Sequence, residues 1–332
     1  MYTDKTKEQL FLKIFNKGDF EFSYSSLNRL LFSPQLFYKE YILKEREIRM
    51  EKHLIEGSLT HLLLLEPQKF DDVYIISPSK TPSAALQTAL KIVMNTKGAG
   101  KLADYDDDIL SALATVNLYQ SVKDDGKKLA KVITVENQTF YDFISTSDRT
   151  VIDQEAYDRC EVRVQLIKDN EDVMALFNDA VSTDFELDDV EIYNEQFLSC
   201  KTKNYKFGLK GYIDRYTVDH KKEEINIIDL KTTGKSIADF EDTVEFYNYW
   251  MQAAIYKRLV LNEMSSTAKH YELTYRFVVI DKYNQVYVFR VTDKTMTKWE
   301  NGLNVILDVA DYHCINNRYD LPYKFLTQTV TI

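Results

Sequence analysis

Apolar and polar residues alternate along several segments in the second half of the chain, a pattern that predicts β-strands. The expected strands span about 191–200, 206–219, 224–231, 271–280 and 284–292. Two other segments, about 241–262 and 294–313, predict long helices. Strands that are interrupted by a helix and then resume are typical of a mixed sheet with helices on its faces. We therefore expect an α/β fold with a central mixed sheet of about five strands, flanked by helices.

The N-terminal part of the chain has a helical pattern. Residues 23–43 predict two short helices, of which Ser25 or Ser26 would cap the first. Pro34 suits the first turn of the second helix, where its missing N–H costs nothing. Residues 53–65 predict an apolar helix that ends just before a proline.

The sequence pattern in the middle of the chain reveals little about chemistry. Residues 70–77 predict a short strand. Residues 81–182 are expected to be mainly helical, with a hairpin near 131–143. Since no Gly- or Pro-rich linker divides the chain, we interpret residues 1–332 as a single domain and 81–182 as a helical insertion within it. That insertion would cover the sheet or contact another subunit.

The hairpin within 211–233 places charged residues where apolar ones would pack more easily. With a loop at 220–223, Asp214 lies directly opposite Asp229, and Lys231 shares their face two residues further on. Two facing carboxylates repel each other unless a cation lies between them, and Mg²⁺ prefers oxygen ligands of this kind. A nearby ammonium could then orient or deprotonate the attacking water. The hairpin therefore favours a metal-dependent phosphodiester chemistry.

The same residues also fit a surface hairpin with a cross-strand Lys–Asp pair. In the register given above, the apolar side chains of Ile213, Ile228 and Leu230 point to the opposite face, into the core. A slip of one residue would move Asp214 out of line with Asp229, so the chemistry depends on the register.

Three other features, one of them a pair of residues, are candidates of lower specificity. Gln252 and Tyr256 are four residues apart, so they share one face of the expected helix. His61 follows one turn after Gly57, where the backbone can approach a ligand closely. Glu195, on the strand before the hairpin, could add a carboxylate. Each also has an ordinary structural explanation: a solvated helix face, a hydrogen-bonded core histidine and a surface glutamate.

Charge and composition limit the class of protein. The chain has 332 residues, of which 45% are hydrophobic, so it can bury a large core. Its net charge of −10 argues against a broadly basic nucleic-acid coat, but not against an enzyme whose acids hold Mg²⁺. Local basicity does occur, at Lys201, Lys203, Lys206 and Lys210.

The three cysteines indicate a reducing compartment. Cys160, Cys200 and Cys314 are few and far apart, which argues for the cytoplasm and against a zinc or iron–sulfur site. The sequence contains no apolar run of about 18 residues, so no membrane span is expected.

Five motifs occur along the chain, and their order identifies a family more specifically than any one motif does. They are SYSSLNRLLFSP (23–34), EGSLTHLLLLEPQKFDDVY (56–74), GYID (211–214), IIDLKTT (227–233) and QAAIY (252–256). In this order the chain resembles the PD-(D/E)XK nuclease superfamily, and most of all its RecE-like branch of phage and prophage exonucleases. The resemblance covers about 23–77 and 190–262, and it implies a restriction-endonuclease-like core.

The resemblance implies a metal site. His61, Asp214 and Asp229 would bind Mg²⁺ or Mn²⁺, with the backbone carbonyl of Leu230 as a further ligand and Glu195 as an additional carboxylate. Related nucleases that carry an iron–sulfur cluster use four cysteines, which this chain does not have.

The resemblance also implies an activity. Lys231 would position or activate water, while Gln252 and Tyr256 match a QxxxY element that supports this lysine and contacts DNA. The expected reaction is 5′→3′ exonucleolytic hydrolysis of linear double-stranded DNA from its ends, giving 5′-phosphate products. Enzymes of this branch form rings and work beside a single-strand annealing protein, so a homo-oligomer and such a partner are expected, in the host cytoplasm if a phage encodes the chain.

Two alternatives stay open on the sequence. One is a catalytically silent member that binds DNA or protein, although the intact Asp214, Asp229 and Lys231 speak against it. The other is a structure-specific endonuclease on the same core.

Residues 81–182 and the tail 323–332 are candidates for subunit contacts.

Overall fold

The computed structural model describes residues 3–46, 51–145, 149–178, 190–264 and 268–330. The chain divides into two compact units. The larger consists of Met1–Leu65 together with Arg163–Ile332, and the smaller of Glu66–Val162. No helix among the described residues is both long and apolar enough to span a membrane.

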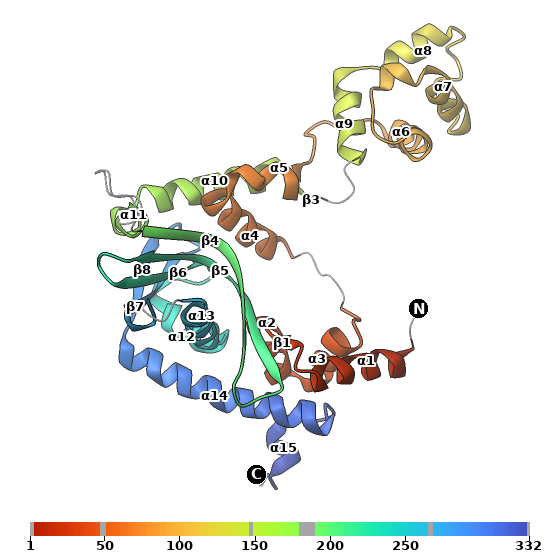
Figure 1. The fold of residues 1–332 in the computed structure, drawn as a ribbon. Helices are drawn as coiled ribbons and strands as arrows, with labels where there is room; N and C mark the ends of the chain where they lie inside the picture. Colours follow the sequence, from red (N-terminus) through yellow and green to blue (C-terminus); the bar gives the residue numbers. More distant parts are fainter. Residues whose placement is uncertain (1–2, 47–50, 146–148, 179–189, 265–267, 331–332) are drawn as a thin grey trace. The chain divides into compact units, whose positions relative to one another are not determined.

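A mixed sheet of six strands forms the centre of the larger unit (Figure 1). The strands are β1 (Phe20–Phe22), β4 (Val190–Lys201), β5 (Phe207–Asp219), β6 (Glu224–Thr232), β7 (Glu272–Ile280) and β8 (Val286–Val291). β1 pairs parallel with β5, β6 pairs parallel with β7, and the other pairs are antiparallel. The expected α/β fold with a central mixed sheet is confirmed, and five strands lie where the alternation predicts them. The short strand β1 was not anticipated, because three residues carry too little pattern.

The hairpin has the predicted loop and register. β5 ends at Asp219 and β6 begins at Glu224, and these two residues face each other. The pairing of the two strands runs from there as far as Arg215 and Ile228. It stops one residue before Asp214, so the two strands separate at the position where the acids were expected to face each other.

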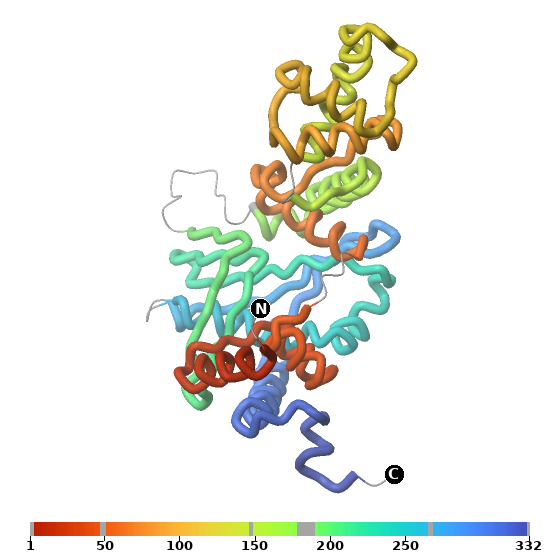
Figure 2. Tube along the Cα trace, turned by 90° about the vertical axis from the view of Figure 1, so that its right-hand side faces the viewer, coloured from red at the N-terminus to blue at the C-terminus, as the bar shows by residue number. Residues whose placement is uncertain are grey.

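Helices α1 (Asp4–Asn16), α2 (Tyr24–Phe32) and α3 (Pro34–Phe37), with a π-turn at Tyr38–Ile42, precede α4 (Lys52–Leu65). Ser23, not Ser25 or Ser26, caps α2, so that expectation was wrong. Ser23 has extended backbone angles and accepts from the Ser26 N–H, while the Ser26 hydroxyl completes a capping box. Pro34 occupies the first turn of α3 as predicted. Figures 1 and 2 both show β4 and β5 reaching the N-terminal helices, where β1 joins the sheet.

The helix expected at 241–262 is two helices, α12 (Phe240–Phe246) and α13 (Tyr249–Glu263). Asn248, between them, has a φ of 57°, in the left-handed region that asparagine tolerates better than most residues. α14 (Asp293–Asn316) agrees with the helix expected at 294–313, and α15 (Tyr323–Thr327) follows it.

Each face of the sheet is covered by helices (Figure 1). On one face α13 and α14 enclose the main core, which includes Ile213. On the other face, Ile228 and Leu230 pack with residues of α10 (Gln154–Lys168), α11 (Glu171–Asn178) and α4. The expectation that Ile213 and Leu230 share one face was therefore wrong, although both side chains are buried. The separation of β5 from β6 turns Ile213 toward the opposite layer.

The smaller unit is built mostly from helices around its own core. It contains α5 (Phe70–Val73), α6 (Ala84–Lys97), α7 (Asp106–Thr115), α8 (Asp125–Val132), α9 (Val135–Ser145) and a parallel pair, β2 (Tyr74–Ile76) with β3 (Thr150–Ile152).

Two expectations for this unit need correction. The hairpin expected near 131–143 is wrong, because α8 and α9 cover this segment, and Val132 of α8 packs into the same core as Phe140 and Tyr141 of α9. The strand expected at 70–77 begins only at Tyr74, after one helical turn. Residues 146–148 and 179–182 of the expected helical region, and 331–332 of the tail, lie outside the described residues.

Candidate functional site

The sheet has an open stretch along one edge of β5. β4 pairs with β5 along one edge, while β1 and β6 share the other. β1 occupies 207–209 and β6 occupies 215–219, so residues 210–214 have no strand partner on that edge among the described residues. We call this stretch, residues 210–214 of β5, the window. Side chains from both faces of the sheet can therefore meet there.

Two acids lie opposite each other across β4 and β5 at this window. The pairs Asn194–Arg215 and Gln196–Ile213 flank the position where Glu195 is opposite Asp214. Asp229 lies on β6, one residue beyond the end of its pairing with β5. Glu195 has a φ of 46°, in a region that glutamate rarely adopts, and such backbone conformations concentrate at functional sites.

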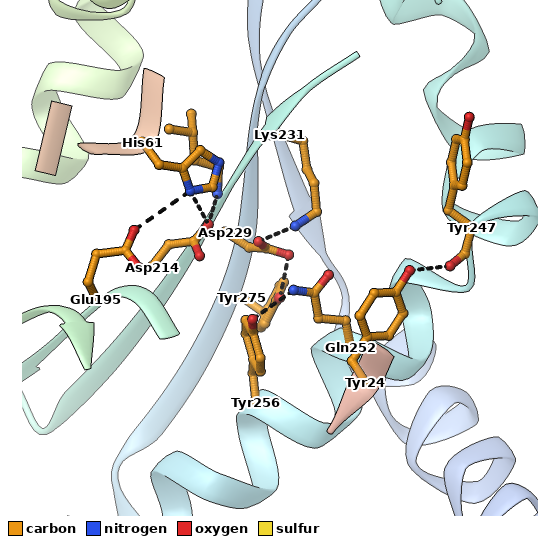
Figure 3. A network of polar contacts seen from close by, with 11 residues as sticks. Tyr24, His61, Glu195, Asp214, Asp229, Lys231, Tyr247, Gln252, Tyr256 and Tyr275 are labelled. Atoms are coloured by element: carbon orange, nitrogen blue, oxygen red, sulfur yellow. Dashed lines mark hydrogen bonds and ion pairs between the residues drawn. The ribbon is translucent and has the colours of Figure 1, made fainter. Parts of the chain in front are cut away.

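His61 reaches the window from α4 (Figure 3). Its Nδ1 lies 3.6 Å from Asp214 Oδ2 and 3.7 Å from Glu195 Oε1. Burial lowers the pKa of His61, but the charge of Asp214 and the hydrogen bond with Glu195 outweigh burial and raise the pKa overall. Gly57 allows α4 to lie against β6, because a Cβ at this position would be only 3.1 Å from Thr232 Oγ1.

Asp229 and Lys231 form a buried pair on the other side of the window. The Asp229 carboxylate has no exposed surface; Lys231 Nζ donates to its Oδ1, and the Tyr275 hydroxyl donates to its Oδ2 over 2.9 Å. Burial raises the pKa of Asp229 to about 6, with Asp214 adding to the effect and Lys231 opposing it. Burial also lowers the pKa of Lys231, but Asp229 and Asp214 outweigh it, so Lys231 keeps its ammonium form. Lys231 Nζ lies 4.8 Å from the centre of the Tyr249 ring.

The Asp214 carboxylate bridges the two strands where their backbone pairing ends. Its Oδ2 accepts the Leu230 N–H over 2.8 Å, so a side chain takes the place of a backbone acceptor. This contact brings the Leu230 backbone to the cluster. From the sequence, we expect the Leu230 carbonyl, not its N–H, to be a metal ligand. That role stays a prediction.

Gln252 and Tyr256 share one face of α13, as their spacing predicts. Both are buried, and Gln252 Nε2 donates to the Tyr256 hydroxyl over 2.7 Å. Burial raises the pKa of Tyr256 well above its usual value, and the charges of Asp214 and Asp229 raise it further. Asp229 and the Tyr249 ring, rather than Gln252, contact Lys231 in this structure.

Three tyrosines of this site were missed by the sequence analysis. Tyr275 comes from β7, Tyr249 begins α13, and the Tyr24 hydroxyl donates to the Tyr247 carbonyl. Tyr24 lies within the SYSS motif, so the local sequence gave a signal that it belongs to the site. The local sequence gave no such signal for Tyr275 and Tyr249, since only the packing of distant segments brings them to Asp229 and Lys231.

The residues at the window fit a divalent cation. One ligand atom each of His61, Glu195 and Asp214 lies within 4.8 Å of the other two. Asp229 is outside this group, with both of its oxygens bonded to Lys231 and Tyr275. Together the three carboxylates carry more negative charge than the one ammonium, and such a surplus favours a bound cation with oxygen and imidazole ligands.

Comparison with known proteins identifies a family. A sequence model described as the PD-(D/E)XK nuclease superfamily matches residues 21–312. Among solved structures, a candidate exonuclease from Eubacterium rectale is similar, with 12% identity and a TM-score of 0.43 over 99% of this chain and 97% of that one. No curated protein sequence matches the chain.

Proposed function

Because the chain belongs to the PD-(D/E)XK nuclease superfamily, we propose that it is a metal-dependent DNA exonuclease. Its substrate would be linear double-stranded DNA, digested 5′→3′ to 5′-phosphate products in phage-type recombination or DNA processing. The observation that carries the proposal is the meeting of His61, Glu195 and Asp214 beside the buried Asp229–Lys231 pair. Divalent-metal use is general in this superfamily, and the surplus of carboxylates supports it here.

His61, Glu195, Asp214 and Asp229, with the Leu230 carbonyl, would hold Mg²⁺ or Mn²⁺. A divalent ion bound there would polarise the phosphodiester and lower the pKa of water. The Leu230 N–H holds Asp214 and the Tyr275 hydroxyl holds Asp229, so both carboxylates would be restrained when an ion binds. His61 must be neutral to act as a ligand, so its raised pKa means that protons would compete with the ion for the imidazole.

Lys231 would act as a fixed positive charge rather than as a base. Its ammonium form is favoured by Asp229, and its position over the Tyr249 ring restricts its movement. Such a charge can orient the attacking water and stabilise the negative charge that develops on the phosphate, after which the 3′ oxygen leaves. Gln252 and Tyr256 would support this end of the site and contact DNA.

The test uses duplex DNA labelled at either the 5′ or the 3′ end, with Mg²⁺ or Mn²⁺. We expect early release of the 5′ label as a mononucleotide while the 3′ label stays in long fragments. Closed circular DNA should stay intact. The Lys231→Ala variant serves as the control for contaminating nuclease. Cleavage of circles would favour a structure-specific endonuclease, and no digestion with either metal would favour a silent binding protein.

We also propose that the enzyme is a homo-oligomer that works with a single-strand annealing protein in the cytoplasm. The reduced, buried state of Cys160, Cys200 and Cys314 is compatible with that compartment. Size-exclusion chromatography with light scattering tests the assembly, and a mass equal to one 38.9 kDa chain at all concentrations would contradict it.

A further inference from the structure

A pocket of about 520 Å³ opens beside the window of β5. Gln252 and Tyr256 of α13 and Tyr24 of α2 line one part of it, so it adjoins the candidate catalytic cluster. Phe197 of β4, with Lys210 and Tyr212 of β5, lines the other part. Its volume is in the range of pockets that hold one small organic ligand or one nucleotide.

An exposed aromatic pair forms part of this wall. Phe197 and Tyr212 face each other across β4 and β5, with ring centres 5.2 Å apart and planes tilted by 56°. They are 45% and 60% exposed, whereas the neighbouring Leu198 and Ile213 are buried. These two rings therefore add little to the core, and their free faces are suited to stacking against a planar, partly apolar group such as a nucleobase.

One lysine lies at the same wall without an acidic partner. Lys210 is half-buried and lines the pocket. No carboxylate among the described residues pairs with its ammonium. An unpaired cation at the wall of a pocket favours a bound anion, and phosphate is the anion of the proposed substrate.

We propose that this pocket is a nucleotide subsite for a single strand of nucleic acid. The base stacks on Phe197 and Tyr212, and Lys210 contacts a phosphate of the same strand. At about 3.3 Å per residue, Tyr212 and Lys210 lie about 7 and 13 Å along β5 from Asp214, so a strand can follow β5 away from the cluster. The inference rests on the proposed function for the identity of its ligand, but it assigns a site beyond the cleavage cluster.

The test measures binding of a fluorescein-labelled single-stranded oligothymidylate by anisotropy, with EDTA present so that nothing is hydrolysed. The double variant Phe197→Leu, Tyr212→Leu keeps apolar bulk but removes the aromatic faces, and should bind about tenfold more weakly. The variant Phe325→Leu, at an equally exposed phenylalanine of α15 outside the pocket, should bind like the wild type. An oligonucleotide of abasic residues should bind the wild type and the double variant equally weakly.

A second measurement examines the phosphate contacts. The slope of log K against log salt should be less steep by about 0.7 for Lys210→Gln, since this lysine would neutralise one phosphate of a single strand. An unchanged slope in this variant, or equal oligonucleotide binding by the aromatic variant and the wild type, would overturn the subsite.

Failure of the proposed function gives a different result. If the wild type digests no DNA but its oligonucleotide binding still depends on the two rings, the subsite stands and the exonuclease does not. If the wild type digests linear DNA and the aromatic variant matches it in both binding and KM, the exonuclease stands and the subsite falls.

Discussion

Replacing Lys231 with methionine tests the physical basis of the candidate site most directly. Methionine keeps most of the apolar stem but removes the ammonium that compensates Asp229. Lys231 is 9% exposed and Asp229 is 0% exposed, so water cannot replace the lost partner without local opening. The carboxylate would keep the hydrogen bond from Tyr275, while Asp214 would continue to repel it.

Breaking a buried ion pair by removing one partner typically costs about 3–5 kcal/mol. We expect a loss of this size in the free energy of unfolding of Lys231→Met in EDTA. The loss should be smaller with Mg²⁺, because the cation binds the folded protein and compensates the same carboxylates. Turnover should fall at least about 100-fold at saturating Mg²⁺, the cost of removing one charge-stabilising donor from an active site.

Urea denaturation followed by tryptophan fluorescence measures the change. Both tryptophans, Trp250 and Trp299, belong to the larger unit, so the signal reports the part of the chain that carries the site. The matched control is Lys235→Met, four residues further on, where the ammonium lies over the Phe246 ring instead of a carboxylate. A loss below about 1 kcal/mol in EDTA, or an equal loss with and without Mg²⁺, would refute the view that Lys231 compensates a buried acid cluster.

Three further substitutions test the roles of individual residues. Asp229→Asn should reduce cleavage by at least about 1,000-fold while duplex DNA binding, measured by anisotropy, persists, because a metal ligand rather than the fold is lost; an active Asn variant would show that Asp229 is not a ligand. His61→Ala should raise the Mg²⁺ concentration needed for half-maximal activity more than it lowers the melting temperature, and gross unfolding would instead assign His61 to the core. Tyr256→Phe removes only the hydroxyl that accepts from Gln252, so its kcat should fall less than that of Lys231→Met; the reverse order would mean that the hydroxyl takes part in the reaction.

The local sequence determined much of the sheet and of the hairpin. The sequence pattern located β4 to β8, and a loop of four residues set the register of β5 and β6 as far as Arg215 and Ile228. That Asp214 lies near Asp229 and Lys231 follows from the hairpin, since residues on adjacent strands of a hairpin are neighbours in space. The spacing of Gln252 and Tyr256 on one helix is local in the same way.

Other features depended on contacts between distant segments. β1 pairs with β5 across nearly the whole N-terminal half of the chain, and this pairing together with the early end of β6 leaves residues 210–214 open. Tyr275 reaches Asp229 only because β7 lies parallel to β6, and His61 reaches Asp214 only because Gly57 lets α4 approach the sheet. No pattern within a short segment of neighbouring residues encodes such contacts. The sequence by itself therefore determined which residues carry the chemistry, while the tertiary structure decided where the sheet opens for them to meet.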